Sequence, residues 1–245
     1  GLPHQNTESI KTTIDTVLSL DPDRLALYHY AHLPHIFKPQ RRIDTNVVPG
    51  SEEKLDMLQY CVQTLTERGY VFIGMDHFAK PDDELSIALK EGFLQRNFQG
   101  YSTYADCDLV AIGVSSIGKI GSTYSQNERD IDAYYAALDA GHLPIMRGYQ
   151  LNQDDILRRN IIQDLMCRFS LDYQIYESVF GIPFSRYFAA ELEDMKQLET
   201  LGLVRLKPHS LTVTPKGRFL IRNIAMVFDY HLRHKETKAK YSQTV

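Results

Sequence analysis

The sequence has no apolar stretch that approaches the roughly 20 residues a helix needs to cross a bilayer. Residues 1–5 contain no charged segment followed by an apolar one, which argues against a secretory signal peptide. An initiator methionine is also missing, and we therefore interpret the sequence as a piece of a longer protein. Internal repeats and low-complexity segments are absent too, which leaves the class of ordinary globular domains.

Cysteine is scarce, because the 245 residues contain only Cys61, Cys107 and Cys167. No two of them have the spacing of metal ligands or of a redox pair, and an odd number without an export signal predicts reduced thiols in the cytoplasm. The formal net charge of −4 gives no general attraction to nucleic acid or to anionic membranes. We therefore expect a cytoplasmic protein that binds neither of them.

The first half alternates helical and strand-like segments. Helices are predicted at 7–20, 51–68 and 82–91, with Asn6 or Thr7 as the first cap and Gly69 and Gly92 at later ends. Short apolar segments predict strands at 24–30, 70–74 and 107–112. Strands separated by helices imply right-handed crossovers and a parallel sheet. Three strands cannot close a barrel, so we expect a remnant of a partial (β/α) barrel, whose bare edge at 24–30 could self-associate.

The second half has a different pattern. A helix at 128–140 and an extended piece at 144–149 precede helices at 152–168, 172–180 and 185–201, a hairpin wing at 203–206 and 211–213, and a final helix at 215–234. This order predicts a mostly helical, winged-helix-like domain. We expect a barrel part at 1–121, a connecting segment at 122–150 and the helical domain at 151–245.

A winged-helix module raises the possibility of nucleic-acid binding, which requires a basic recognition helix. The candidate helix at 185–201 carries Arg186 and Lys196 against four acidic residues, so phosphate groups would be repelled. These four are Glu191, Glu193, Asp194 and Glu199. A nucleic-acid-binding function is therefore a distant alternative.

Binding residues in parallel sheets collect just past the carboxyl ends of the strands. Three such turns follow the predicted strands, at 30–34, 75–78 and 113–118, and we expect them on one face. The third is flanked by glycines that allow a ligand close to the backbone, and its Ile117 could pack on an adenine ring. An ordinary tight turn explains the same residues.

Polar and aromatic residues in two loops supply further candidates. Phe98 offers a stacking face and Gln99 a hydrogen-bonding amide, although an aromatic-anchored surface loop would look the same. Arg41 and Arg42 could hold carboxylates, or they could lie in a solvated loop. His77 beside Asp76 could form an acid–base pair. His29, His32 and His35 have no cysteine or carboxylate that completes a metal site, so no metal ligands are predicted.

Five segments in order resemble the bacterial oxygen-independent coproporphyrinogen III oxidase family, and the resemblance extends over the whole sequence. The segments are Gly1-Leu2-Pro3-His4-Gln5, Tyr30-Ala31-His32-Leu33-Pro34, Gly74-Met75-Asp76-His77-Phe78, Arg96-Asn97-Phe98-Gln99-Gly100-Tyr101 and Lys216-Gly217-Arg218-x-Leu220-Ile221-Arg222-Asn223. The resemblance is to the C-terminal half of the family. The family's cysteine motif, CxxxCxxC, has no counterpart in the sequence.

The resemblance implies a radical S-adenosylmethionine enzyme of haem biosynthesis. Such enzymes use a [4Fe-4S] cluster to generate a 5′-deoxyadenosyl radical and convert two propionates of coproporphyrinogen III into the vinyl groups of protoporphyrinogen IX. The resemblance implies two S-adenosylmethionine molecules in the full-length enzyme. The residues here that match cofactor contacts are Ala31, Phe98, Gln99 and Ile117. This chain alone is expected to be inactive, and a related haem chaperone is the alternative within the superfamily.

Overall fold

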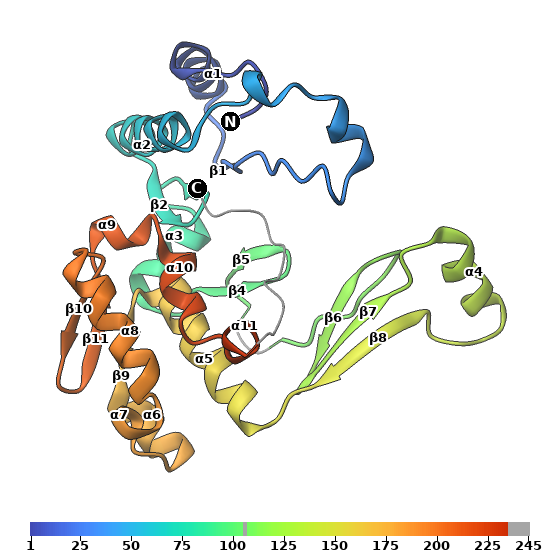
Figure 1. Ribbon diagram of the computed structural model, residues 1–245, viewed down its shortest axis with the longest axis vertical. Helices are drawn as coiled ribbons and strands as arrows, with labels where there is room; N and C mark the ends of the chain where they lie inside the picture. Colours follow the sequence, from blue (N-terminus) through green and yellow to red (C-terminus); the bar gives the residue numbers. More distant parts are fainter. Residues whose placement is uncertain (105–106, 235–245) are drawn as a thin grey trace.

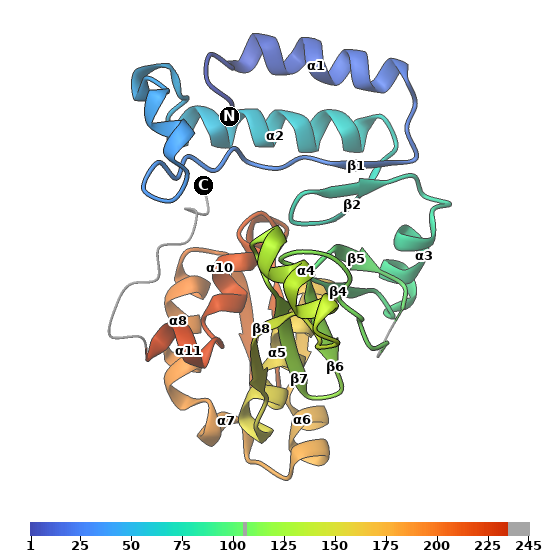
Figure 2. The same cartoon turned by 90° about the vertical axis from the view of Figure 1, so that its right-hand side faces the viewer.

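The N-terminal part of the fold combines two long helices with a small sheet. The structure, a computed structural model, describes residues 1–104 and 107–234. Helices α1 (Thr7–Ser19) and α2 (Ser51–Glu67) lie side by side (Figure 2), and Asn6 caps α1 by accepting a 2.9 Å hydrogen bond from the Ser9 N–H. Between α1 and α2 the chain forms β1 (Arg24–Ala26) and a long loop with two 3-10 turns, η1 (Lys38–Arg42) and η2 (Thr45–Val47). The core under the helices consists of Ile14, Cys61, Leu65, Tyr70 and Phe78.

The sheet of this part is antiparallel, so the prediction of a parallel sheet was wrong. Strands β1 (Arg24–Ala26) and β2 (Val71–Gly74) both pair with β3 (His77–Ala79), which lies between them. They do run in the same direction, as the crossover through α2 requires, but positive φ angles at Gly74 (155°) and Met75 (50°) turn the chain straight back into β3. No described strand covers the other edge of β1, and self-association there stays a prediction.

Three antiparallel strands form an arm that extends away from the rest of the molecule, with α4 (Ile131–Asp139) at its far end (Figure 1). The strands are β6 (Ile117–Ile120), β7 (Thr123–Asn127) and β8 (Ile145–Gln150). The strand predicted at 107–112 is absent, because only Leu109 pairs there, through a single bridge to Lys119. The 113–118 turn therefore belongs to the arm, and the three predicted turns do not share one sheet edge.

The C-terminal part packs around α5 (Gln153–Arg168) and has the expected wing. Strands β10 (Val204–Lys207) and β11 (Ser210–Val213) form the hairpin, and β9 (Ser170–Asp172) adds an unpredicted third strand beside β11. The single final helix predicted at 215–234 was wrong, because the chain bends at 219–220 and 227–229 and Asp229 starts a new helix. The elements after α5 are β9 (Ser170–Asp172), α6 (Tyr173–Phe180), α7 (Phe184–Tyr187), α8 (Ala189–Thr200), β10 (Val204–Lys207), β11 (Ser210–Val213), α9 (Pro215–Arg218), α10 (Ile221–Met226) and α11 (Tyr230–Arg233).

A second hairpin joins the two parts. Strands β4 (Gln95–Asn97) and β5 (Gly100–Ser102) follow the short helix α3 (Glu84–Glu91) and lie against α5. The Tyr101 hydroxyl donates to the Met166 carbonyl at 3.1 Å, and Leu94 is fully buried in the larger core together with Ile161 and Leu165. The hairpin is thus held firmly on α5, and its tip is the start of the candidate site.

Candidate functional site

A cavity of about 1120 Å³ lies between the β4–β5 hairpin, the base of the arm, the first turns of α5 and the start of α11. The hairpin contributes Phe98 and Gln99, the arm Lys119 and Tyr124, and α5 a row of polar side chains. Its volume is slightly above the range of roughly 300–1,000 Å³ that is usual for small-molecule sites. The cavity can therefore hold a large ligand.

Phe98 and Gln99 form the tip of the hairpin. The Asn97 carboxamide accepts the Gln99 N–H at 2.8 Å, and Gly100 turns the backbone with a φ of 129°. Phe98 is 56% exposed, with its ring edge-on to that of Tyr124 at 5.4 Å between centroids. The Gln99 side-chain amide has no hydrogen-bond partner among residues 1–104 and 107–234. A stacking face and a free amide therefore stand together at the cavity wall.

The other predicted site residues lie outside this cavity. Ile117 begins β6, two residues before the lining residue Lys119. Ala31 lies in the long loop before η1, where its carbonyl accepts the Gln40 side-chain amide at 3.0 Å. Arg41 and Arg42 are in η1, and the Arg41 Nε donates to the Pro34 carbonyl at 2.8 Å. The structure brings Phe98 and Gln99 together, but not Ala31 or the two arginines of η1.

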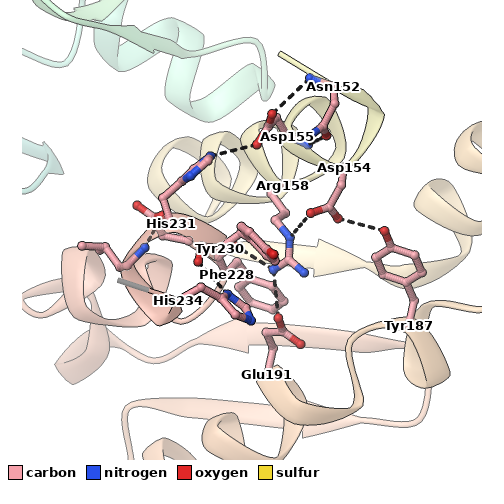
Figure 3. A network of polar contacts seen from close by, with 12 residues as sticks. Asn152, Asp154, Asp155, Arg158, Tyr187, Glu191, Phe228, Tyr230, His231 and His234 are labelled. Carbon is pink, nitrogen blue, oxygen red and sulfur yellow. Dashed lines mark hydrogen bonds and ion pairs between the residues drawn. The ribbon is translucent and has the colours of Figure 1, made fainter. Parts of the chain in front are cut away.

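Arg158 on α5 joins three elements behind the cavity (Figure 3). Its guanidinium lies 2.8 Å from Asp154 and 2.8 Å from Glu191, and it donates to the Phe228 carbonyl at 3.2 Å. The rings of Phe188 and Tyr230 flank it at 5.0 and 5.5 Å. Burial alone would lower the pKa of Arg158, but the carboxylates of Glu191 and Asp154 raise it. Arg158 therefore stays charged and fixes the back wall.

Asp155 ties α5 to the arm and to α11. Its carboxylate accepts the Asn152 N–H at 3.0 Å and the Tyr149 hydroxyl at 3.1 Å, and it lies 3.0 Å from the His231 Nε2. Burial would raise the pKa of Asp155, but the bonds from Asn152, His231 and Tyr149 outweigh burial and lower it. The spacing Asn152-x-x-Asp155 signals a helix cap, but nothing local in the sequence points to Tyr149 or His231 as partners.

The pair formed by Asp76 and His77 lies elsewhere, at the β2–β3 turn. The Asp76 carboxylate is 2.7 Å from His77 Nδ1, and the ring of Tyr101 lies edge-on to that of His77 at 5.3 Å. Both side chains are mostly buried, at 12% and 17% exposed. An oriented imidazole is thus present, but neither residue lines the cavity.

An iron–sulfur cluster does not fit the described residues. Burial raises the pKa of Cys61 to about 11 and that of Cys167 to about 12, whereas a metal ligand must be a thiolate. Cys107 is exposed and isolated, and within 1–104 and 107–234 no three histidine, cysteine or acidic side chains converge on a metal position.

No helix within residues 1–104 and 107–234 is long and apolar enough to span a membrane.

Known proteins match this chain closely. The family model of the HemN C-terminal domain matches residues 151–220. A protein of Pseudomonas aeruginosa called oxygen-independent coproporphyrinogen III oxidase is 49% identical, over 95% of this chain and 50% of its own length. A protein of Escherichia coli with the same name is 46% identical, over 100% of this chain and 54% of its own length.

Among solved structures, one described as coproporphyrinogen III oxidase (HemN) from Escherichia coli, a radical SAM enzyme, has a TM-score of 0.91 and 47% sequence identity. The alignment covers 95% of this chain and 54% of the other. This chain spans about half the length of these two curated relatives.

Proposed function

The chain belongs to the oxygen-independent coproporphyrinogen III oxidase family, as the C-terminal half of its members, and from this premise we propose that it supplies one wall of the site in which a full-length enzyme converts coproporphyrinogen III into protoporphyrinogen IX. Each of two propionates would lose a hydrogen atom to the 5′-deoxyadenosyl radical, one electron to an electron acceptor, and CO2, and would become a vinyl group. The observation that carries the proposal is the 1120 Å³ cavity, with Phe98 and Gln99 at its edge, in a chain of 49% identity to a protein of that name.

Phe98 and Gln99 fit one end of an S-adenosylmethionine molecule. The exposed Phe98 ring can stack on a flat base, and the free amide of Gln99 can donate and accept hydrogen bonds at a polar edge. The cofactor, when bound in the full-length enzyme, supplies a radical that removes a hydrogen atom from the substrate. We propose that Ile117 and Ala31 contribute to cofactor contacts through parts of the site that this cavity does not include.

The [4Fe-4S] cluster of the full-length enzyme belongs to the other half, because the cysteines described here are buried or isolated. On this proposal, residues 1–121 complete the barrel, 122–150 connect, and 151–245 form the substrate-side domain. The match of the HemN C-terminal domain to residues 151–220 supports this division. Three free thiols suit the cytoplasm, where we place the enzyme.

The related haem chaperone is the competing function within the superfamily. The two differ in outcome, because an oxidase consumes coproporphyrinogen III and a chaperone holds haem unchanged. Anaerobic incubation of the cluster-loaded full-length protein with S-adenosylmethionine, a reductant and coproporphyrinogen III tests the difference. We expect protoporphyrinogen IX and the loss of two CO2. Stable haem binding without turnover would overturn the proposal.

A further inference from the structure

Two arginines on neighbouring walls of the cavity each have a buried nitrogen without a partner. Arg96 lies on β4 and Arg159 on α5, and both line the 1120 Å³ cavity. The Arg96 Nε and the Arg159 Nη1 are buried and make no hydrogen bond to any residue the structure describes. A buried donor that is left unpaired costs free energy, and this cost is higher for a charged group. Two such donors at one cavity therefore indicate a missing acceptor.

The acidic side chains of the cavity are engaged elsewhere. Asp155 is held by Asn152, Tyr149 and His231, as described above. Asp108 accepts the Gly121 N–H at 2.8 Å, and Asp229 caps α11 by accepting the Leu232 N–H at 3.0 Å. No ion pair in the described residues includes Arg96 or Arg159, whereas their neighbour Arg158 has two carboxylate partners. These two guanidinium groups are thus the cationic groups of the cavity that a ligand could pair with bidentately.

The backbone and side chain of Arg96 are held in place, so its guanidinium does not need a ligand for its position. With its amide turned to suit both groups, Gln163 on α5 accepts from the Arg96 N–H at 2.6 Å and donates to the Arg96 carbonyl at 3.1 Å. The Arg96 guanidinium lies 5.7 Å from the centroid of the Tyr101 ring. Arg159 is on the same helix as Gln163, one turn earlier. Preorganisation of this kind reduces the ordering cost of binding.

We propose that Arg96 and Arg159 form a carboxylate-binding pair. Arginine presents two parallel N–H donors that match a carboxylate, and each bond is charge-assisted. The identity of the ligand rests on the proposed function, in which the carboxylate is a propionate of the porphyrinogen. The same cavity wall carries Phe98 and Gln99, so a substrate anchored here lies beside the residues proposed for the cofactor.

The test uses this chain and two probes. Citrate serves as a simple carboxylate, compared with chloride at equal ionic strength, and its binding is followed by the melting temperature. Coproporphyrin III serves as a stable tetracarboxylate and its tetramethyl ester as the uncharged control, both followed by fluorescence. The variants are Arg159→Gln, Arg159→Lys and Arg96→Gln. Arg205→Gln is the control, because Arg205 is exposed on β10.

Citrate should raise the melting temperature of the parent and of Arg205→Gln, but not that of Arg159→Gln or Arg96→Gln. The dissociation constant for coproporphyrin III should rise about tenfold or more in both glutamine variants, and less in Arg159→Lys. The ester should bind all variants equally weakly. Without ligand, Arg159→Gln should melt no lower than the parent, because it removes a buried donor atom that has no partner, whereas a structural arginine would lower the melting temperature.

Failure of the pair and failure of the proposed function give different results. Coproporphyrin III binding that is equal in all variants would overturn the pair and leave the function standing. A citrate effect that depends on both arginines, without coproporphyrin III binding to any variant, would support the carboxylate-binding pair. The same result would contradict the proposal that the bound carboxylate is a propionate of the porphyrinogen. No response of the parent to either probe would overturn the pair.

Discussion

At the scale of single residues, Gln99 is the position where function and structure can be separated. Its backbone is fixed by Asn97, but its amide makes no contact that stabilises the described fold. In the full-length enzyme, Gln99→Ala should therefore keep its melting temperature and its cluster absorbance. Loss of hydrogen bonds to a charged cofactor should cost about 1.5–3 kcal/mol, or about 10- to 150-fold in affinity or rate.

Gln99→Leu is the matched control for size, and it should lose as much turnover as Gln99→Ala. Turnover, melting temperature and cluster absorbance are measured together on both variants. Turnover within about twofold of the parent would remove Gln99 from the site. A parallel fall in melting temperature would make Gln99 a structural residue.

Unlike Gln99, the ion pair between Arg158 and Glu191 should contribute to the stability of the fold, because its side chains are only 11% and 7% exposed. Glu191→Ala removes one of the two carboxylates that hold the buried Arg158, while Asp154 remains, so it should lower the free energy of unfolding by about 1–3 kcal/mol. Urea denaturation measures this change. Glu193→Ala is the control, because its pair with Lys196 is 67% and 64% exposed and should contribute less than about 1 kcal/mol. Equal effects of both substitutions would contradict the structural role of Arg158.

Asp155 should give the protein an acid-sensitive contribution to stability. The pKa of Asp155 is lowered in the folded protein, because the bonds from Asn152, His231 and Tyr149 outweigh burial. Its stabilisation is therefore fully present above the unfolded pKa of about 3.9 and is lost as the pH falls through the lower folded pKa. The stability difference between the parent and Asp155→Asn, measured by urea denaturation, should shrink below about pH 4. A difference that is constant from pH 7 to pH 3 would contradict this assignment.

At the scale of elements, close packing of the wing depends on Gly217 in α9. A Cβ atom there would lie 2.0 Å from the Leu203 carbonyl oxygen and 2.9 Å from a Val213 methyl group. Gly217→Ala must push the helix away from the wing, and it should destabilise the protein by about 3 kcal/mol or more. Gly50→Ala is the control, because nothing lies within 4 Å of its Cβ position, and thermal denaturation should show a much smaller loss. Equal losses of stability in the two variants would contradict the close contact between α9 and the wing.

Most helices were predictable from the sequence, because their signals are local, although the single helix predicted at 215–234 is divided into α9, α10 and α11. The cap at Asn6 and the left-handed glycine Gly92 are in place, and the capping box at Asn152 and Asp155 starts α5 where its sequence pattern begins. The wing was also found, since short apolar strands flank a polar turn. Such features depend on residues within one turn of each other.

Sheet direction was not predictable, because strand pairing is decided by distant residues. The segment 77–79 is too short to show the alternation of apolar and polar residues that predicts a strand. In the sequence, Gly74 and Met75 look like the end of a strand, but in the structure they form the turn of a β-hairpin. Phe98 and Gln99 were candidates from residue type and from the family resemblance, whereas the cavity and its lining residues Arg158, Asp155 and His231 come from elements far apart in the chain. The unpaired nitrogens of Arg96 and Arg159 likewise require burial, which a sequence does not state.

At the scale of the whole molecule, the β4–β5 hairpin, the arm and the C-terminal helices meet at one cavity and all contribute to its walls. Figures 1 and 2 show the hairpin and the arm as separate parts of the ribbon. The described cysteines do not suit a cluster, while the cavity suits a large ligand with carboxylates. We therefore propose that this chain binds the substrate and that the other half of the enzyme generates the radical.

A chimaera tests most directly whether this chain binds the substrate while the other half of the enzyme generates the radical. The N-terminal part of the Escherichia coli relative, up to the point where the match to this chain begins, is fused to residues 1–245 and loaded anaerobically with iron and sulfide. This chain alone, treated in the same way, should stay colourless and leave coproporphyrinogen III unchanged. The chimaera should be brown and form protoporphyrinogen IX, and Gln99→Ala in the chimaera should slow this conversion at unchanged iron content. A folded chimaera with a full complement of iron that binds S-adenosylmethionine but forms no product would contradict the account.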